Sequence, residues 1–181
     1  MRKYIYALIA SLLAVPASAA LKTGASAPLF TTQASLGGKA FTFSLAEALK
    51  EGLVVLYFYP KAFTSGCTVE AHMFAEATDE FKALGASVIG ISKDSIETLN
   101  KFSVEACQSK FAVGADDGKI IKSYDAALLF SYANRTSFVI APTPGQEGGT
   151  VIYSYTAMDP DLHVANTMNA VKMWRAAQTK P

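Results

Sequence analysis

Apolar positions along this chain form two kinds of pattern: short unbroken runs, and longer stretches in which they recur every three or four residues. The run Leu53–Phe58 is apolar throughout and contains two valines, which predicts an interior strand buried on both faces. From Cys67 onward the apolar residues follow a helical period that stops at Gly85, which predicts a helix. Its predicted inward face consists of Val69, Met73, Ala77, Phe81 and Leu84.

The same patterns predict the remaining elements. Further strands are expected at Leu29–Gln33 and Ala40–Phe43 (a hairpin around Gly37-Gly38), Ser87–Ser92, Phe111–Ala115, and Thr136–Ala141 with Val151–Tyr155 as a second hairpin. A capping-box pattern, Ser44-x-x-Glu47, opens a short helix, and Asp94 or Ser95 caps another. The inward residues of that second helix are predicted to be Ile96, Leu99, Phe102 and Ala106. A short helix is expected at Ile120–Tyr124, and a last one at Asp161–Gln178 with Leu162, Ala165, Met168, Val171 and Trp174 facing inward.

This order of elements predicts an α/β fold. Strands alternate with helices first, and a hairpin and a final helix follow. We therefore expect a mixed central β-sheet flanked by helices, with an N-terminal β-hairpin and right-handed crossovers. Ligand sites in such sheets lie beyond the carboxyl ends of the parallel strands, and Cys67 follows one of these ends.

The first 19 residues have the pattern of a secretory signal. Arg2 and Lys3 precede an apolar run, and Ala17-Ser18-Ala19 fits the small-residue rule for cleavage. We expect residues 1–19 to be a signal peptide and residues 20–181 to form one domain in the periplasm or outside the cell. Removing the signal leaves 14 basic and 15 acidic residues, a net charge of −1. This balance gives no reason to expect binding to nucleic acid or to an anionic membrane.

Cys67 is the leading candidate for chemistry. It stands behind the loop Pro60–Gly66, where a buried strand ends and a helix begins. A helix N-terminus carries unpaired N–H groups and partial positive charge, which favour a thiolate over a thiol. The thiolate is the nucleophile of thiol redox chemistry, so we expect a functional cysteine here rather than a structural one.

The segment Pro60-x-x-x-Thr64-x-x-Cys67 matches the P-x-x-x-T-x-x-C signature of the peroxiredoxins. The wider run from Phe58 to Ala71 resembles the Q-type (bacterioferritin-comigratory) branch, and the resemblance extends from about Lys22 to the last helix. It includes Asp116-x-Gly118-Lys119 and Arg135-x-x-Phe138-Val139-Ile140. The resemblance implies a thioredoxin-like fold and a thiol peroxidase that uses no cofactor.

The resemblance also implies roles for single residues. Cys67 would be the peroxidatic cysteine that a hydroperoxide oxidises to a sulfenic acid. Thr64 would hydrogen-bond the thiolate and the peroxide, Arg135 would pair with the sulfur, and Pro60 would shape and shield the pocket. The reducing power would come from a thioredoxin-like protein or another thiol, and a monomer and a homodimer both remain open.

Two departures from the Q-type pattern bear on the mechanism. Phe63 and Ser65 stand where Asp and Pro are usual, and Phe63 makes the rim of the site more apolar. Many Q-type members carry a resolving cysteine five residues after the first, where this chain has His72. Other members place it on the next helix, so Cys107 is the resolving candidate. If Cys107 cannot reach Cys67, an external thiol resolves the sulfenic acid.

Other interpretations use the same residues. Glu70 either caps the helix or orients Arg135, and His163 is expected to be structural. A copper-binding module of thioredoxin fold could use Cys67, His72 and His163 as soft ligands. A disulfide oxidoreductase normally needs a C-x-x-C pair, which this chain lacks. No motif for a metal, flavin, haem or nucleotide is found in the sequence.

Overall fold

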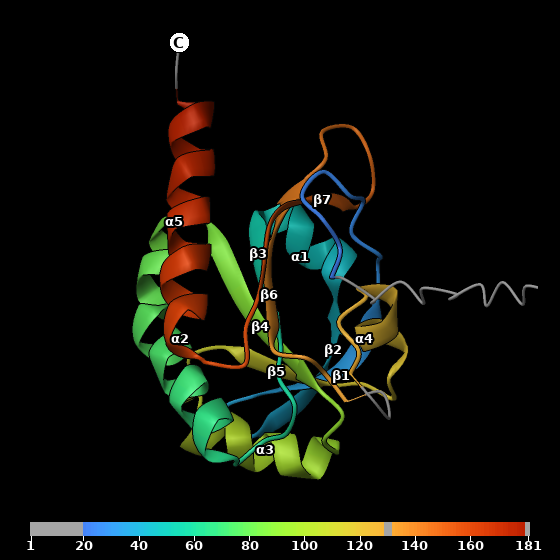
Figure 1. The fold of residues 1–181 in the computed structure, drawn as a ribbon, viewed down its shortest axis with the longest axis vertical. Coiled ribbons are helices and arrows are strands. Elements are labelled where there is room, and N and C mark those ends of the chain that lie inside the picture. The colour runs from blue at the N-terminus through green and yellow to red at the C-terminus, as the bar shows by residue number, and fades with distance from the viewer. Residues whose placement is uncertain (1–19, 129–131, 180–181) are drawn as a thin grey trace, which may run out of the picture.

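The computed structural model describes residues 20–128 and 132–179, in which a seven-stranded mixed sheet is covered by helices on both faces (Figure 1). The strand order is β2-β1-β5-β4-β3-β6-β7. Strands β3, β4 and β5 run parallel to one another, and the other pairings are antiparallel. The signal-peptide prediction concerns residues 1–19, which lie outside the described residues.

The boundaries of the elements lie within two residues of those predicted from the sequence, except for the first strand, which was expected at Leu29–Gln33 and ends three residues later. The strands are β1 (Thr31–Leu36), β2 (Lys39–Ser44), β3 (Leu53–Phe58), β4 (Ala86–Ser92), β5 (Ala112–Ala115), β6 (Thr136–Pro142) and β7 (Gly149–Thr156). The helices are α1 (Leu45–Glu51), α2 (Ser65–Ala83), α3 (Ile96–Glu105), α4 (Lys119–Ser123) and α5 (Asp161–Gln178). Both predicted hairpins are confirmed, and Ser95 rather than Asp94 caps α3, because the Ser95 hydroxyl accepts from the Thr98 amide.

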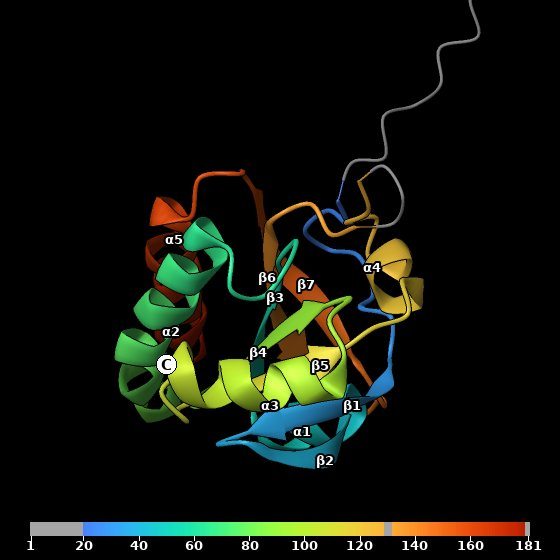
Figure 2. The same cartoon turned by 90° about the horizontal axis from the view of Figure 1, so that it is seen from below.

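The core lies in two layers on either side of the sheet. Helices α2, α3 and α5 cover one face, and α1 and α4 cover the other (Figure 2). Alternate residues of β3 supply both layers: Tyr57 belongs to the first and Phe58 to the second, and every residue of this strand is buried. An unbroken apolar run is therefore what this interior position requires.

The buried face of α2 differs from the predicted one. Val69 is 47% exposed, and the buried residues are Cys67, Glu70, Ala71, Phe74, Ala75, Thr78 and Phe81. The prediction was wrong for Val69, whereas Phe81 is buried and Met73, Ala77 and Leu84 are half-buried against the same core. The fully buried positions are shifted by about one residue because Glu70 and Thr78 interrupt the apolar pattern. Both polar side chains are nevertheless tolerated in the core, since Glu70 pairs with Arg135 and the Thr78 hydroxyl donates to the carbonyl of Phe74.

The same correction applies to α5. Leu162 and Ala165, predicted to face inward, are exposed, and the buried residues are His163, Val164, Thr167, Met168 and Val171. The Thr167 hydroxyl donates to the His163 carbonyl at 2.7 Å, so its burial leaves no unpaired hydroxyl hydrogen. Satisfied polar residues can thus line a buried face, and an apolar periodicity cannot detect them.

No helix within the described residues is both long and apolar enough to cross a membrane.

Candidate active site

The loop between β3 and α2 is fixed by contacts with the end of β4. The Tyr59 amide donates to the Ile91 carbonyl at 3.1 Å, and the Ala62 amide donates to Oδ2 of Asp94 at 2.7 Å. Phe63, with a left-handed φ of 64°, places its ring edge-on against Phe102 of α3, with the ring centroids 5.1 Å apart. The loop is therefore held in one conformation, with Thr64 at its end as the N-cap residue of α2.

Cys67 is the third residue of α2 and only 1% exposed. Its Sγ atom accepts a hydrogen bond from Nη2 of Arg135 at 3.4 Å. A Cβ atom at Gly66 would lie 3.2 Å from the same nitrogen, so the absence of a side chain there gives the guanidinium room. The positive end of the helix and the guanidinium both favour a negative charge on this sulfur.

Sheet register brings Arg135 to this position. Thr136, the first residue of β6, pairs with Phe58, the last residue of β3. Arg135 therefore emerges at the same edge of the sheet as the loop that leads to Cys67. The guanidinium is buried, being part of a residue that is 3% exposed, and its Nε atom donates to the Met158 carbonyl at 2.9 Å.

Glu70 is the second anionic partner of Arg135. Its Oε2 atom accepts a hydrogen bond from Nη1 of Arg135 in an ion pair that is buried on both sides. Burial raises the pKa of the Glu70 carboxyl to about 8, although Arg135 acts in the opposite direction. Of the two roles considered for Glu70, the structure thus favours orientation of the arginine over helix capping.

Thr64 and Pro60 lie on the loop beside the cysteine. Thr64 is exposed, and its hydroxyl donates to the Lys61 carbonyl at 3.0 Å. The hydroxyl oxygen keeps lone pairs that can accept a hydrogen bond from a peroxide. Pro60 is half-buried two residues after β3.

Cys107 follows the C-terminal end of α3 and is fully buried. Both cysteines are free thiols and belong to the same hydrophobic cluster on one face of the sheet. Burial in this apolar environment raises the pKa of the Cys107 thiol far above its usual range. The next two residues, Gln108 and Ser109, have φ values of 50° and 57°, so the chain is strained immediately after Cys107.

His163 is the site residue that sequence reasoning missed. It is fully buried, and its Nδ1 atom lies 3.7 Å from Oε1 of Glu70. The same nitrogen is 2.7 Å from the Ser137 hydroxyl oxygen, and Nε2 is 2.9 Å from the Ala157 carbonyl oxygen. The sequence suggested a structural role for His163, or a copper ligand, because nothing in the sequence places the start of the last helix beside Glu70.

The structure does not bring the two histidines together with Cys67 as a metal centre. His72 is half-buried on α2, and residues 20–128 and 132–179 contain no group of three or more His, Cys, Asp or Glu side chains that could hold a metal ion. The copper-binding alternative therefore gains no support from the described part of the chain.

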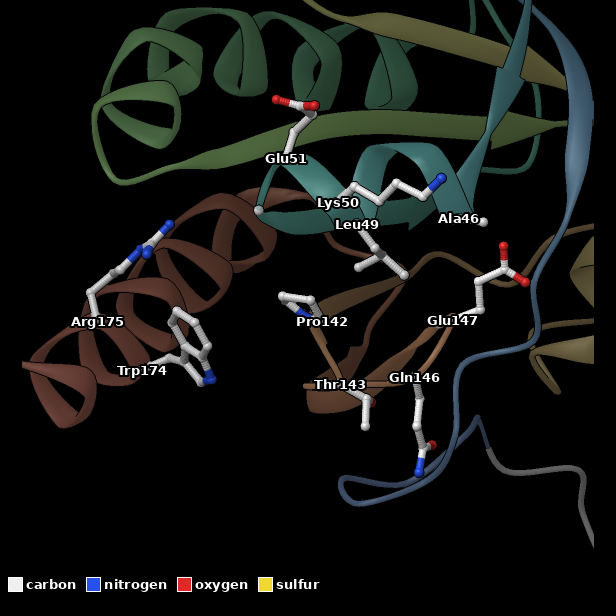
Figure 3. Close-up of a pocket in the computed structure, with 13 residues that line it drawn as sticks. Ala46, Leu49, Lys50, Glu51, Pro142, Thr143, Gln146, Glu147, Trp174 and Arg175 are labelled. Carbon is white, nitrogen blue, oxygen red and sulfur yellow. The ribbon is translucent and has the colours of Figure 1, made fainter.

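A separate cleft of about 460 Å³ lies at the opposite end of the sheet, between α1, the β6–β7 loop and α5 (Figure 3). Gly52, just before β3, and Pro142, at the end of β6, both line it. Arg175 at the edge of the cleft binds the chain just after α2: its Nε and Nη2 atoms donate to the carbonyls of Leu84 and Gly85 at 2.5 and 3.1 Å. The lining residues include neither cysteine nor histidine.

Comparison with known proteins agrees with this geometry. The AhpC/TSA family matches residues 23–145, and the chain belongs to this family. Among its relatives, chloroplastic peroxiredoxin Q of Oryza sativa subsp. japonica is 31% identical over 153 residues, which cover 82% of this chain and 66% of the rice protein. Peroxiredoxin Bcp of Bacillus subtilis is 30% identical over 126 residues, or 66% of this chain and 77% of that protein.

Solved structures show the same fold. Peroxidoxin BcpB of Mycobacterium tuberculosis superposes with a TM-score of 0.73 at 27% identity, over 84% of this chain and 97% of that chain. The expected thioredoxin-like fold and the resemblance to the Q-type peroxiredoxins are thereby confirmed. The family favours a peroxidase over the copper-binding and thiol–disulfide alternatives.

The two cysteines differ in environment, which predicts different reactivities. We expect iodoacetamide at mildly acidic pH to modify Cys67 faster than Cys107, because a guanidinium and a helix start face Cys67 whereas apolar burial keeps Cys107 protonated. Peptide mapping after timed alkylation measures both rates, and the urea-unfolded protein, in which both thiols are solvated, is the control. Equal rates and equal pH profiles in the folded protein would contradict the assignment.

Proposed function

We propose that this peroxiredoxin is a thiol-dependent peroxidase in which Cys67 reduces hydrogen peroxide or an organic hydroperoxide. The observation that carries the proposal is the 3.4 Å contact between Nη2 of Arg135 and Sγ of Cys67 at the start of α2. A sulfur held beside a buried guanidinium is available as a nucleophile, and the same cation can stabilise charge that develops on a substrate oxygen.

The reaction follows from this arrangement. The Cys67 thiolate attacks the terminal oxygen of the hydroperoxide, and the S–O bond forms as the O–O bond breaks. Sulfur loses two electrons and becomes a sulfenic acid, while the leaving oxygen gains them and takes a proton to give water or an alcohol. A hydroperoxide is neutral, so its binding depends on directed hydrogen bonds, for which Arg135 is the donor and the Thr64 oxygen an acceptor.

Charge on the leaving oxygen is stabilised by groups that are already in place. Three interactions fix the Arg135 guanidinium: those with Cys67, Glu70 and the Met158 carbonyl. A preorganised donor of this kind needs no rearrangement during the reaction, so its loss lowers the rate constant strongly. Pro60, which is half-buried, is proposed to shape and shield the approach to the sulfur.

Substitutions at these positions test the assignment. We expect Cys67→Ser to abolish peroxide consumption, and Arg135→Lys to lower the second-order rate constant by on the order of a hundredfold, because a lysine cannot reproduce the fixed donor geometry. Stopped-flow oxidation with hydrogen peroxide and cumene hydroperoxide measures both. Glu76→Gln, an exposed change on the same helix, serves as the control. A fully active Cys67→Ser protein would refute the proposal.

The proposed resolving residue is Cys107. Its thiol attacks the Cys67 sulfenic acid, an S–S bond forms and water leaves. Cys107 is buried, so formation of the disulfide requires the segment that follows α3 to move away from the core. Both cysteines belong to one hydrophobic cluster, which supports their proximity. The left-handed residues Gln108 and Ser109 and the position of Cys107 just beyond the helix end support the opening.

The oxidised products decide between resolution within the chain and by an external thiol. After one equivalent of peroxide we expect mass spectrometry to find a Cys67–Cys107 disulfide, and Cys107→Ser to accumulate the sulfenic or sulfinic acid of Cys67. The matched control is unoxidised protein carried through the same digestion. Oxidised Cys67 beside a free Cys107 thiol in the wild type would reject Cys107 and leave an external thiol to resolve the site.

The proposed setting is the periplasm or the exterior of the cell, with a thioredoxin-like or other thiol as reductant. The support is the basic start, apolar run and Ala17-Ser18-Ala19 of the first 19 residues. We expect the N-terminus of the protein recovered from the exported fraction to be Ala20. Recovery of the uncut chain in the cytoplasm alone would oppose this setting.

A further inference from the structure

The buried active site contains two anionic groups and one fixed cation. Arg135 contacts both the sulfur of Cys67 and the carboxylate of Glu70, and all three residues are at most 3% exposed. A thiolate together with a carboxylate would leave this cluster with a net negative charge away from water. An uncompensated buried charge is costly in free energy. Ionisation of the sulfur is therefore favoured if a nearby group takes up one extra proton.

The structure places a proton acceptor at the free side of Glu70. Oε2 of Glu70 is bonded to Arg135, whereas Oε1 accepts no hydrogen bond from the described residues and is buried. The ionisable atom facing Oε1 is Nδ1 of His163, at 3.7 Å. A small movement of either side chain brings these two atoms to hydrogen-bond distance.

The hydrogen bonds of His163 allow it to gain and lose this proton. The Ala157 carbonyl can only accept, so Nε2 of His163 carries a hydrogen in every state. Nδ1 is then the atom that titrates. The Ser137 hydroxyl, 2.7 Å from Nδ1, donates to the neutral ring and can rotate to accept from the charged one.

We propose that His163 is a positioning residue of the active site, an inference that rests on the proposed function. His163 and Glu70 share one proton while Cys67 is ionised. The shared proton neutralises Glu70, so the positive charge of the Arg135 guanidinium stabilises the sulfur. Either Oε1 of Glu70 or Nδ1 of His163 carries this proton. When Cys67 becomes a neutral sulfenic acid, the pair releases the proton, which neutralises the leaving oxygen directly or through solvent, and Glu70 alone balances Arg135.

The surroundings of the pair agree with this sharing. Burial raises the pKa of Glu70 to about 8, and burial, together with Arg135, lowers the pKa of His163, so an ordinary carboxylate beside an imidazolium is not the favoured state. The other titratable or charged groups facing the pair are Cys67, Tyr57, Arg135, Tyr155 and Asp159. Two strongly coupled groups of this kind titrate together rather than singly.

Thiolate formation at Cys67 without any peroxide tests the proposal. In a Cys107→Ser background, ultraviolet absorbance at about 240 nm reports the thiolate as pH is raised. We expect His163→Gln, which keeps a donor for Ala157 but cannot titrate, to move the midpoint upward so that about three- to tenfold less thiolate forms at a given low pH. Glu70→Gln is expected to move it downward, because a competing negative charge is lost.

The double variant and a structural control separate sharing from packing. If His163 acts through Glu70, Glu70→Gln/His163→Gln has the same midpoint as Glu70→Gln. Thr167→Val removes a buried hydroxyl that donates to the His163 and Val164 carbonyls but does not contact the imidazole ring, so its midpoint should match that of the parent. A His163→Gln midpoint equal to that of the parent, or a Thr167→Val shift as large as that of His163→Gln, would overturn the proposal.

The wild-type protein provides a second measurement that needs no core substitution. The chain has only two histidines, so imidazole NMR signals can be followed for His163 and, as an internal control, for half-buried His72. Alkylation of Cys67 removes its charge, and we expect the His163 titration to move to lower pH while that of His72 stays in place. An unchanged His163 signal would refute sharing. Since no peroxide is used, this outcome leaves the peroxidase proposal untouched.

Discussion

The active site depends on one buried guanidinium. Arg135 joins the sulfur of Cys67, the carboxylate of Glu70 and the carbonyl of Met158, which come from the first two turns of α2 and from the loop before α5. Removing one partner of such a buried charge pair typically costs about 3–5 kcal/mol, because the remaining charge stays desolvated. The same contact that is proposed to make the sulfur reactive therefore also ties three parts of the chain together.

The sheet supplies the frame for this contact. Parallel β3 and β4 end at the same edge, where Asp94 holds the Ala62 amide and Ile91 receives the Tyr59 amide. Antiparallel β6 starts at that edge, so a residue just before it meets the loop just after β3. Chemistry at the carboxyl ends of parallel strands is common in open α/β sheets. Here the arginine reaches the site from an antiparallel neighbour.

Buried polar residues connect the site with the helical layer. Glu70 on α2 and His163 on α5 approach each other to 3.7 Å. These two helices lie side by side on one face of the sheet (Figure 1). Each would be costly in an apolar core, and each is retained by a specific partner: Arg135 for the carboxylate, and Ser137 with Ala157 for the imidazole. The helices are thereby packed against the sheet through polar contacts as well as apolar ones.

The sequence alone determined the elements and the candidate nucleophile. The unbroken run Leu53–Phe58, the hairpin glycines Gly37 and Gly38 and the helix start at Cys67 are local signals, because strand burial, turn conformation and dipole depend on neighbouring residues. Only the tertiary structure decided which side chains meet. The pairing of Arg135 with Glu70, the approach of His163 and the inward faces of α2 and α5 depend on strand register and helix packing. The two pairs, Arg135–Glu70 and His163–Glu70, join residues 65 and 93 positions apart. Interactions over such separations leave no periodic trace in the chain.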